Sequence, residues 1–181
     1  MLTEFQIKKL TKLFNTFDGN RNGFRELEDA RLMINKLAHI RGWEKGSAEY
    51  KKIEDAYMNL HFKILELADT NQDGKITLEE HLAFYDHILA TGEYRIHLNG
   101  FVTFVMDIFD ADGDGLISPT EYKHFFHVYN LPEDEAEEAF AHLDLNGDGQ
   151  ISNEEWRQAL EEFYFNEDPN APGNWFLGRL E

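Results

Sequence analysis

Apolar residues recur at helical spacing around four short polar segments. The pairs that precede the segments are Phe14 and Phe17, Leu65 and Ala68, Met106 and Phe109, and Phe140 and Leu143. Those that follow are Met33 and Ile34, Leu82 and Tyr85, Phe125 and Phe126, and Ala159 and Leu160. Because residues three or four apart share one face of a helix, the pattern predicts a polar loop between two amphipathic helices. This unit occurs four times.

The stretch between the first two polar segments is long enough for two helices. It predicts a helix over about 27–40, a break over 41–47 and a long helix over about 48–68. Later in the chain, the Thr91-Gly92 and Asn99-Gly100 pairs mark the connection between two halves.

These turn signals divide the chain into three parts. We expect an N-terminal pair of units in 1–92, a C-terminal pair in 93–165 and a tail in 166–181. The tail contains Trp175, Phe176 and Leu177, whereas a flexible tail is usually polar. We therefore expect it to fold back onto the core, and the competing interpretation is that it binds a partner.

Each polar segment fits the twelve-residue calcium loop D-x-[DN]-x-[DN]-G-x5-E, although the first ends in aspartate. Such a loop supplies oxygen ligands from the side chains at positions 1, 3, 5 and 12 and from the backbone carbonyl at position 7. The predicted ligands are Asp18, Asn20, Asn22, Phe24, Asp29, Asp69, Asn71, Asp73, Lys75, Glu80, Asp110, Asp112, Asp114, Leu116, Glu121, Asp144, Asn146, Asp148, Gln150 and Glu155. The alternative, a set of surface helix caps, explains neither the glycine at position 6 nor the carboxylate at position 12.

Position 8 of these loops is an independent check, because an apolar residue there packs between paired loops. Ile76, Ile117 and Ile151 occupy it in three loops, whereas the first loop has Arg25. The sequence thus predicts an all-α fold of four EF-hand helix-loop-helix units. We expect them to form two pairs in one compact globule, with short β bridges between paired loops.

The loops differ in negative charge, which should order their affinity for a divalent cation. The loop at 110–121 has four acidic ligands, and those at 69–80 and 144–155 have three each. In the loop at 18–29, Asp18 and Asp29 are acidic, and Glu26 at position 9 is a candidate third acid. Since Asp29 is shorter than glutamate, we expect mixed Ca²⁺ and Mg²⁺ occupancy there, and the alternative is an empty loop. Up to four Ca²⁺ ions are predicted.

The composition and the missing motifs argue against several classes of function. The net charge of −18 argues against a nucleic-acid partner, and the absence of cysteine removes thiol catalysis and thiolate metal sites. No apolar run approaches the roughly 20 residues of a membrane span, and the first residues lack a signal-peptide pattern. The serine-hydrolase elbow, the phosphate loop and the H-E-x-x-H motif are all missing. We expect a cytoplasmic monomer that is not an enzyme.

The chain resembles the sarcoplasmic calcium-binding protein and calexcitin family over nearly its whole length. The resemblance rests on Phe14-Asn15-Thr16-Phe17-Asp18, on Asp29, on the long first interval and on the tail from Gly173 to Leu180. It implies a compact four-EF-hand globule and a cytosolic Ca²⁺ and Mg²⁺ buffer, or a neuronal calcium-signalling protein for calexcitin-like members. The chain departs from the family in two ways: all four of its loops still match the calcium-loop motif, and Arg25 stands at a position that is usually apolar.

Three functions follow from this pattern. A buffer is favoured, because the chain has 15 Phe but only 4 Met, and calcium sensors use adaptable Met-rich grooves. A sensor that binds a basic amphipathic target helix is the alternative, since the net charge stays near −10 after four ions. A binder of an apolar organic ligand, like the related photoproteins, is less favoured, because the chain lacks the terminal proline of photoproteins.

Overall fold

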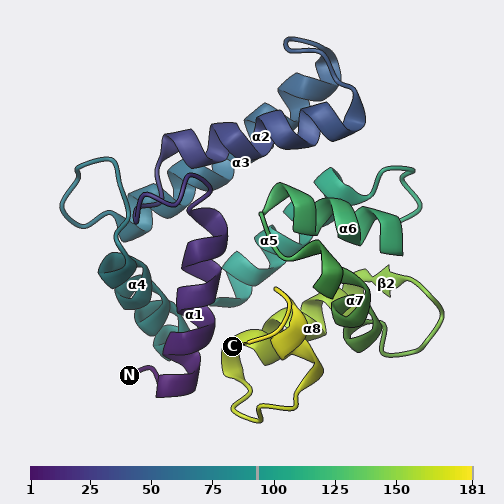
Figure 1. Cartoon of the computed structure of the whole chain (residues 1–181). Helices are drawn as coiled ribbons and strands as arrows, with labels where there is room; N and C mark the ends of the chain where they lie inside the picture. Colours follow the sequence, from purple (N-terminus) through teal and green to yellow (C-terminus); the bar gives the residue numbers. More distant parts are fainter. Residues whose placement is uncertain (93, 181) are drawn as a thin grey trace.

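A computed structural model describes residues 1–92 and 94–180, with the backbone alone over 94–98. Its α-helices are α1 (Glu4–Phe17), α2 (Leu27–Arg41), α3 (Ala48–Ala68), α4 (Leu78–Thr91), α5 (Tyr94–Phe109), α6 (Pro119–Val128), α7 (Ala136–Leu143) and α8 (Asn153–Phe165). Two short strands, β1 (Leu116–Ile117) and β2 (Ile151–Ser152), and two 3-10 helices, η1 (Glu133–Glu135) and η2 (Pro172–Trp175), complete the described elements. Figure 1 shows α1 to α4 grouped on one side and α5 to α8 on the other.

The four helix-loop-helix units form two pairs, as predicted. Backbone hydrogen bonds of 2.9 Å in both directions join Arg25 to Ile76 and so pair the first two loops. The third and fourth loops pair through the antiparallel strands β1 and β2, with Ile117 opposite Ile151. The predicted all-α fold with short β bridges is therefore confirmed.

The helix boundaries agree with the sequence pattern except at one point. α2 and α3 lie where predicted, and Gly42 ends α2 with a φ of 67°. The Asn99-Gly100 pair was expected to mark a connection, but it lies inside α5. This prediction is wrong because α5 buries Val102, Val105 and Phe109, and that burial outweighs the roughly 1 kcal/mol cost of glycine in a helix.

Aromatic side chains fill the interior of the C-terminal half. Trp156, Tyr122 and Phe125 are at most 1% exposed, and their ring centroids lie 5.4 to 5.9 Å apart. Most of these rings meet edge to face, which is a favourable arrangement of their quadrupoles. Such rigid side chains specify one packing arrangement and leave little room for the core to rearrange.

The tail packs against the C-terminal half and reaches α1. Phe176 and Leu177 are at most 1% exposed, and η2 contacts both α7 and α8. A Cβ atom on Gly173 would lie 2.3 Å from the carbonyl oxygen of Ala159, so only glycine permits this close approach to α8. In Figure 1 the yellow tail lies beside α8 and near α1, where Lys12 Nζ donates to the carbonyl oxygen of Arg179.

A buried lysine joins α1 to α8 and the tail. Lys9 is fully buried, and its Nζ donates to the carbonyl oxygens of Glu162 (3.2 Å) and Asn166 (2.7 Å) and to Asn174 Oδ1 (3.4 Å). Burial lowers the pKa of Lys9 from 10.5 to about 8, against the opposing attraction of the Glu167 and Glu162 carboxylates. The charged amine therefore destabilises the folded state relative to the neutral amine.

Lys9 should make stability rise with pH. Its pKa is lower in the folded chain, so the unfolded chain binds more protons between about pH 8 and 10.5, and the cost of burying the charge disappears over that range. We expect the free energy of unfolding of the wild type, relative to Lys9→Met, to rise by up to about 3 kcal/mol. Urea unfolding of both proteins at pH 7.5 and 10.5 measures this difference. A difference that falls with pH would mean that the hydrogen bonds to the ammonium outweigh its burial.

Candidate metal sites

The first aspartate of each loop organises the turn that follows it. Asp110 directly follows α5, and its Oδ2 accepts a hydrogen bond from the Gly115 amide at 2.9 Å. The equivalent bonds run to Asp18 from Gly23, to Asp69 from Gly74 and to Asp144 from Gly149, at 2.8 to 2.9 Å. The glycine at position 6 has a φ of 83° to 88° in all four loops, a region that side chains disfavour.

The oxygens at positions 3 and 5 also accept backbone hydrogen bonds inside the loop. In the second loop, Asn71 Oδ1 accepts from the Asp73 amide, and Asp73 Oδ1 accepts from the Lys75 amide, both at 2.9 Å. The other three loops repeat this pair of bonds at 2.7 to 3.2 Å. These bonds hold the predicted ligand side chains at positions 1, 3 and 5 over the turn.

The carboxylate at position 12 closes each loop onto its start. Glu155 Oε1 accepts from the Leu145 amide at 3.0 Å, and its Oε2 accepts from the Ser152 amide at 2.8 Å. Ser152 in turn accepts from the Glu155 amide, so the residues at positions 9 and 12 cap α8. Thr77 with Glu80 and Ser118 with Glu121 do the same for α4 and α6. The loop end and the helix start are therefore one structural unit.

Hydrogen bonding also sets the ionisation of these carboxylates. The bonds from Thr77 and Thr70 lower the pKa of Glu80 to about 2, although burial opposes them. Burial raises the pKa of Glu155, but the bonds from Ser152, Asn146 and Leu145 outweigh it and leave that pKa below its ordinary value. Both groups are therefore anionic at neutral pH, as ligands of a divalent cation must be.

The predicted ligands suit a hard cation. They consist of carboxylate, amide and backbone carbonyl oxygens, which are the ligands that Ca²⁺ and Mg²⁺ prefer. In the third loop, oxygens of Asp110, Asp112 and Asp114 all lie within 4.8 Å of one another. The structure thus brings the loop residues together as the sequence predicts, and the assignment of each residue as a ligand stays a prediction.

The first loop differs from the others in its cap and its charge. Glu26 takes the capping place that Thr or Ser holds elsewhere, and its Oε1 accepts from Asn22 Nδ2 at 2.5 Å. Its other oxygen lies 3.2 Å from Lys75 Nζ. The hydrogen bond from Asn22 and the contact with Lys75 lower the pKa of Glu26. Burial, in contrast, raises the pKa of Asp29, although the Glu26 and Asn20 amides donate to it.

Neutralising Asp29 tests whether the first loop binds an ion. We expect Asp29→Asn to lower the number of ions bound in a calorimetric titration by one, because one of the loop's few acidic ligands is lost. Glu28→Gln is the matched control: it removes the same charge from the neighbouring, exposed position and should leave the stoichiometry unchanged. Unchanged stoichiometry in Asp29→Asn would mean that the loop is empty in the wild type.

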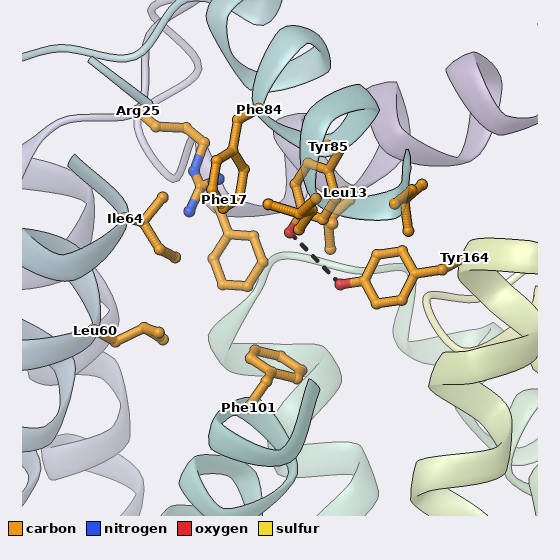
Figure 2. A pocket seen from close by; sticks show the side chains of 11 residues that line it. Leu13, Phe17, Arg25, Leu60, Ile64, Phe84, Tyr85, Phe101 and Tyr164 are labelled. Carbon is orange, nitrogen blue, oxygen red and sulfur yellow. Dashed lines mark hydrogen bonds between the residues drawn. The ribbon is translucent and has the colours of Figure 1, made fainter. Parts of the chain in front are cut away.

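A cavity between the two halves was not predicted from the sequence. It has a volume of about 60 Å³ and is lined by Leu13, Phe17, Arg25, Leu60, Ile64, Phe84, Tyr85, Ile88, Leu89, Phe101 and Tyr164. Figure 2 shows the labelled side chains of α1, α3, α4, α5 and α8 around this space. The sequence shows that Arg25 replaces the usual apolar residue at position 8, but it does not predict that this side chain is buried, with only 9% of its surface exposed.

Family models of known proteins match the segments that contain three of the four loops. EF-hand family models match residues 62–80 and 101–126, and an EF hand domain model matches 135–163. These segments contain the second, third and fourth loops. Three described proteins illustrate the wider similarity.

Calerythrin of Saccharopolyspora erythraea is 27% identical over 168 residues, covering 91% of this chain and 95% of calerythrin. Sarcoplasmic calcium-binding protein 1 of Astacus leptodactylus is also 27% identical, covering 91% of each chain. The solved structure of coelenterazine-binding protein from Renilla muelleri, in the calcium-loaded apo form, superposes with a TM-score of 0.79 at 25% identity and covers 99% of this chain and 100% of that one.

No helix in the described part of the chain is both long and apolar enough to cross a membrane. Calcium binding is supported by the oxygen-lined loops and by their pairing. It is also supported by the similarity to calcium-binding proteins over nine-tenths of the chain. This chain is an EF-hand calcium-binding protein that is similar to the sarcoplasmic calcium-binding proteins over most of its length.

Proposed function

We propose that this protein is a cytoplasmic, monomeric buffer of Ca²⁺ and Mg²⁺ without catalytic activity. Its two loop pairs, in 1–92 and 93–165, take up ions through the twenty predicted ligands, and the segment 166–181 holds the halves closed. The first loop is the site where we expect Mg²⁺ to compete best, because Asp29 is short and the loop has few acidic ligands.

The observation that supports a buffer most strongly is the sealed position of the tail. Phe176 is fully buried, and its ring lies 5.4 to 6.2 Å from the rings of Trp156, Phe163 and Phe101. A calcium sensor must expose an apolar groove for its target, and here the tail fills the apolar space of the C-terminal half. Opening that space would expose a large aromatic surface to water.

Binding of a hydrophobic dye distinguishes a buffer from a sensor. We expect that calcium causes little increase in dye fluorescence and no binding of a basic amphipathic peptide, because the tail stays in place. A strong calcium-dependent increase, together with peptide binding, would favour the sensor. Calorimetric titration with calcium, with and without magnesium, gives the number of sites and their competition.

Binding of an organic ligand is the second candidate function, because the fold is similar to that of the coelenterazine-binding protein from Renilla muelleri described above. The cavity of this chain is about 60 Å³, whereas an engineered cavity that binds a single benzene ring measures about 150 Å³. A ligand with several rings would therefore require the halves to separate. Solvent extraction and absorbance of the purified protein test this function, and a bound chromophore would support it.

A further inference from the structure

The cavity between the halves contains a buried cation that no nearby carboxylate neutralises. No described carboxylate lies within ion-pair distance of the Arg25 guanidinium. The closest groups are neutral: His81 Nδ1 lies 3.0 Å from one guanidinium nitrogen, and the Phe17 ring centroid lies 4.7 Å from Cζ. Asp29 attracts Arg25 only from a greater distance. Burial of an unpaired charge is unfavourable, so this position calls for an anionic partner.

His81 uses only one of the guanidinium donors. Its Nε2 lies 3.0 Å from the carbonyl oxygen of Leu10, which can only accept a hydrogen bond, so Nε2 carries the ring proton. Nδ1 is then an acceptor for Arg25. Burial and the charge of Arg25 hold the pKa of His81 well below its ordinary value, so the ring stays neutral. Since a guanidinium has five N–H donors, others are available to a further acceptor.

The side of the cavity near α4 and α8 adds two hydroxyl groups. The hydroxyl groups of Tyr85 and Tyr164 are hydrogen-bonded to each other at 3.5 Å, and Figure 2 shows this bond as the dashed line at the side of the space that Arg25 and Phe17 also border. Burial raises the pKa of both tyrosines, so both remain protonated; one hydroxyl donates to the other, and the second keeps its proton for a further acceptor. Leucine, isoleucine and phenylalanine side chains form most of the remaining lining.

From these contacts we propose that the cavity binds a small monovalent anion, either chloride or a carboxylate no larger than acetate. The anion pairs with the Arg25 guanidinium and accepts a hydrogen bond from the tyrosine hydroxyl whose proton is free. A planar carboxylate matches the guanidinium fork, and the apolar lining accommodates a methyl group. The volume of about 60 Å³ suits an anion of this size. This inference goes beyond the proposed function and holds whether the protein is a buffer or a sensor.

The acidity of the molecule sets the conditions for binding. A net charge of −18 repels anions, so the anion should bind weakly, in the millimolar range. Bound calcium would neutralise part of that charge, and Arg25 itself lies in the first loop, which pairs with the second through the bridge to Ile76. The calcium-loaded protein is therefore the form to test.

Thermal unfolding at constant ionic strength provides the first test. We expect 100 mM sodium chloride, formate or acetate to raise the unfolding midpoint of the calcium-loaded protein by about 3–5 °C relative to sodium gluconate, which is too large for the cavity. Butyrate should behave like gluconate. Comparing acetate and formate with chloride shows whether the site prefers a carboxylate or a halide. We expect acetate to stabilise more than chloride, because the cavity has apolar walls. Equal midpoints in all five salts would overturn the proposal.

Variants of Arg25 show whether this cavity is the site. Arg25→Met should lose the anion dependence, Arg25→Lys should keep part of it, and Tyr164→Phe should weaken it. Arg31→Met is the control, because Arg31 lies exposed on α2 and its loss leaves the cavity unchanged. Chloride NMR supplies a readout independent of stability: the calcium-loaded wild type should broaden the chloride line, and formate should reverse the broadening. Equal broadening by the wild type and Arg25→Met would contradict the assignment.

Discussion

Removing calcium with a chelator is expected to lower the midpoint of thermal unfolding by roughly 10 °C or more. The third loop alone brings oxygens of three aspartates within 4.8 Å of one another, so their negative charges repel once the ion leaves. An ion present at about 1,000 times its dissociation constant stabilises a protein by about 4 kcal/mol per site. In a chain of this size each kcal/mol corresponds to about 2–4 °C. Scanning calorimetry with calcium and with excess chelator measures the difference.

A matched pair of variants separates metal binding from general charge effects. Glu80 and Glu79 are neighbours at the start of α4, but Glu80 closes the second loop whereas Glu79 is exposed. Glu80→Gln should lose the contribution of one site to the calcium-dependent shift, and Glu79→Gln should keep the full shift. A wild-type midpoint that does not respond to the chelator would rule out metal-coupled stability.

Truncation of Phe176 is expected to destabilise the calcium-loaded protein by about 3–5 kcal/mol. Its side chain is fully buried among aromatic rings from α5, α6 and α8. Phe176→Ala would therefore leave a cavity that the stiff neighbouring rings cannot fill by moving. Urea unfolding in saturating calcium measures the loss of free energy.

Phe62→Ala is the control for this variant. Phe62 is 54% exposed on α3, so the same truncation should cost less than about 1 kcal/mol. Phe176→Ala should also bind a hydrophobic dye in the presence of calcium, because the tail no longer seals the C-terminal half. If both variants lost the same free energy and neither bound dye, the tail would not hold the molecule closed.

The calcium loops and their flanking helices were predictable because their determinants are local. The predicted ligands at positions 1, 3, 5 and 12 and the glycine at position 6 stand within twelve residues of one another. The same short segment also caps the following helix, as Ser118 and Glu121 do for α6. Local rules failed at Asn99-Gly100, where burial of the neighbouring apolar residues carries α5 through a sequence typical of a turn.

The amino-acid sequence by itself determined the helix-loop-helix units, the candidate ligands, the pairing of the loops and the excess of negative charge. Only the tertiary structure decided where the buried cations lie and what they contact. Lys9 meets α8 across 153 residues of chain, and Arg25 meets His81 across 56. No spacing rule links residues so far apart, because their contact depends on how whole helices pack. A buried charge and its surroundings are therefore visible only in the folded molecule.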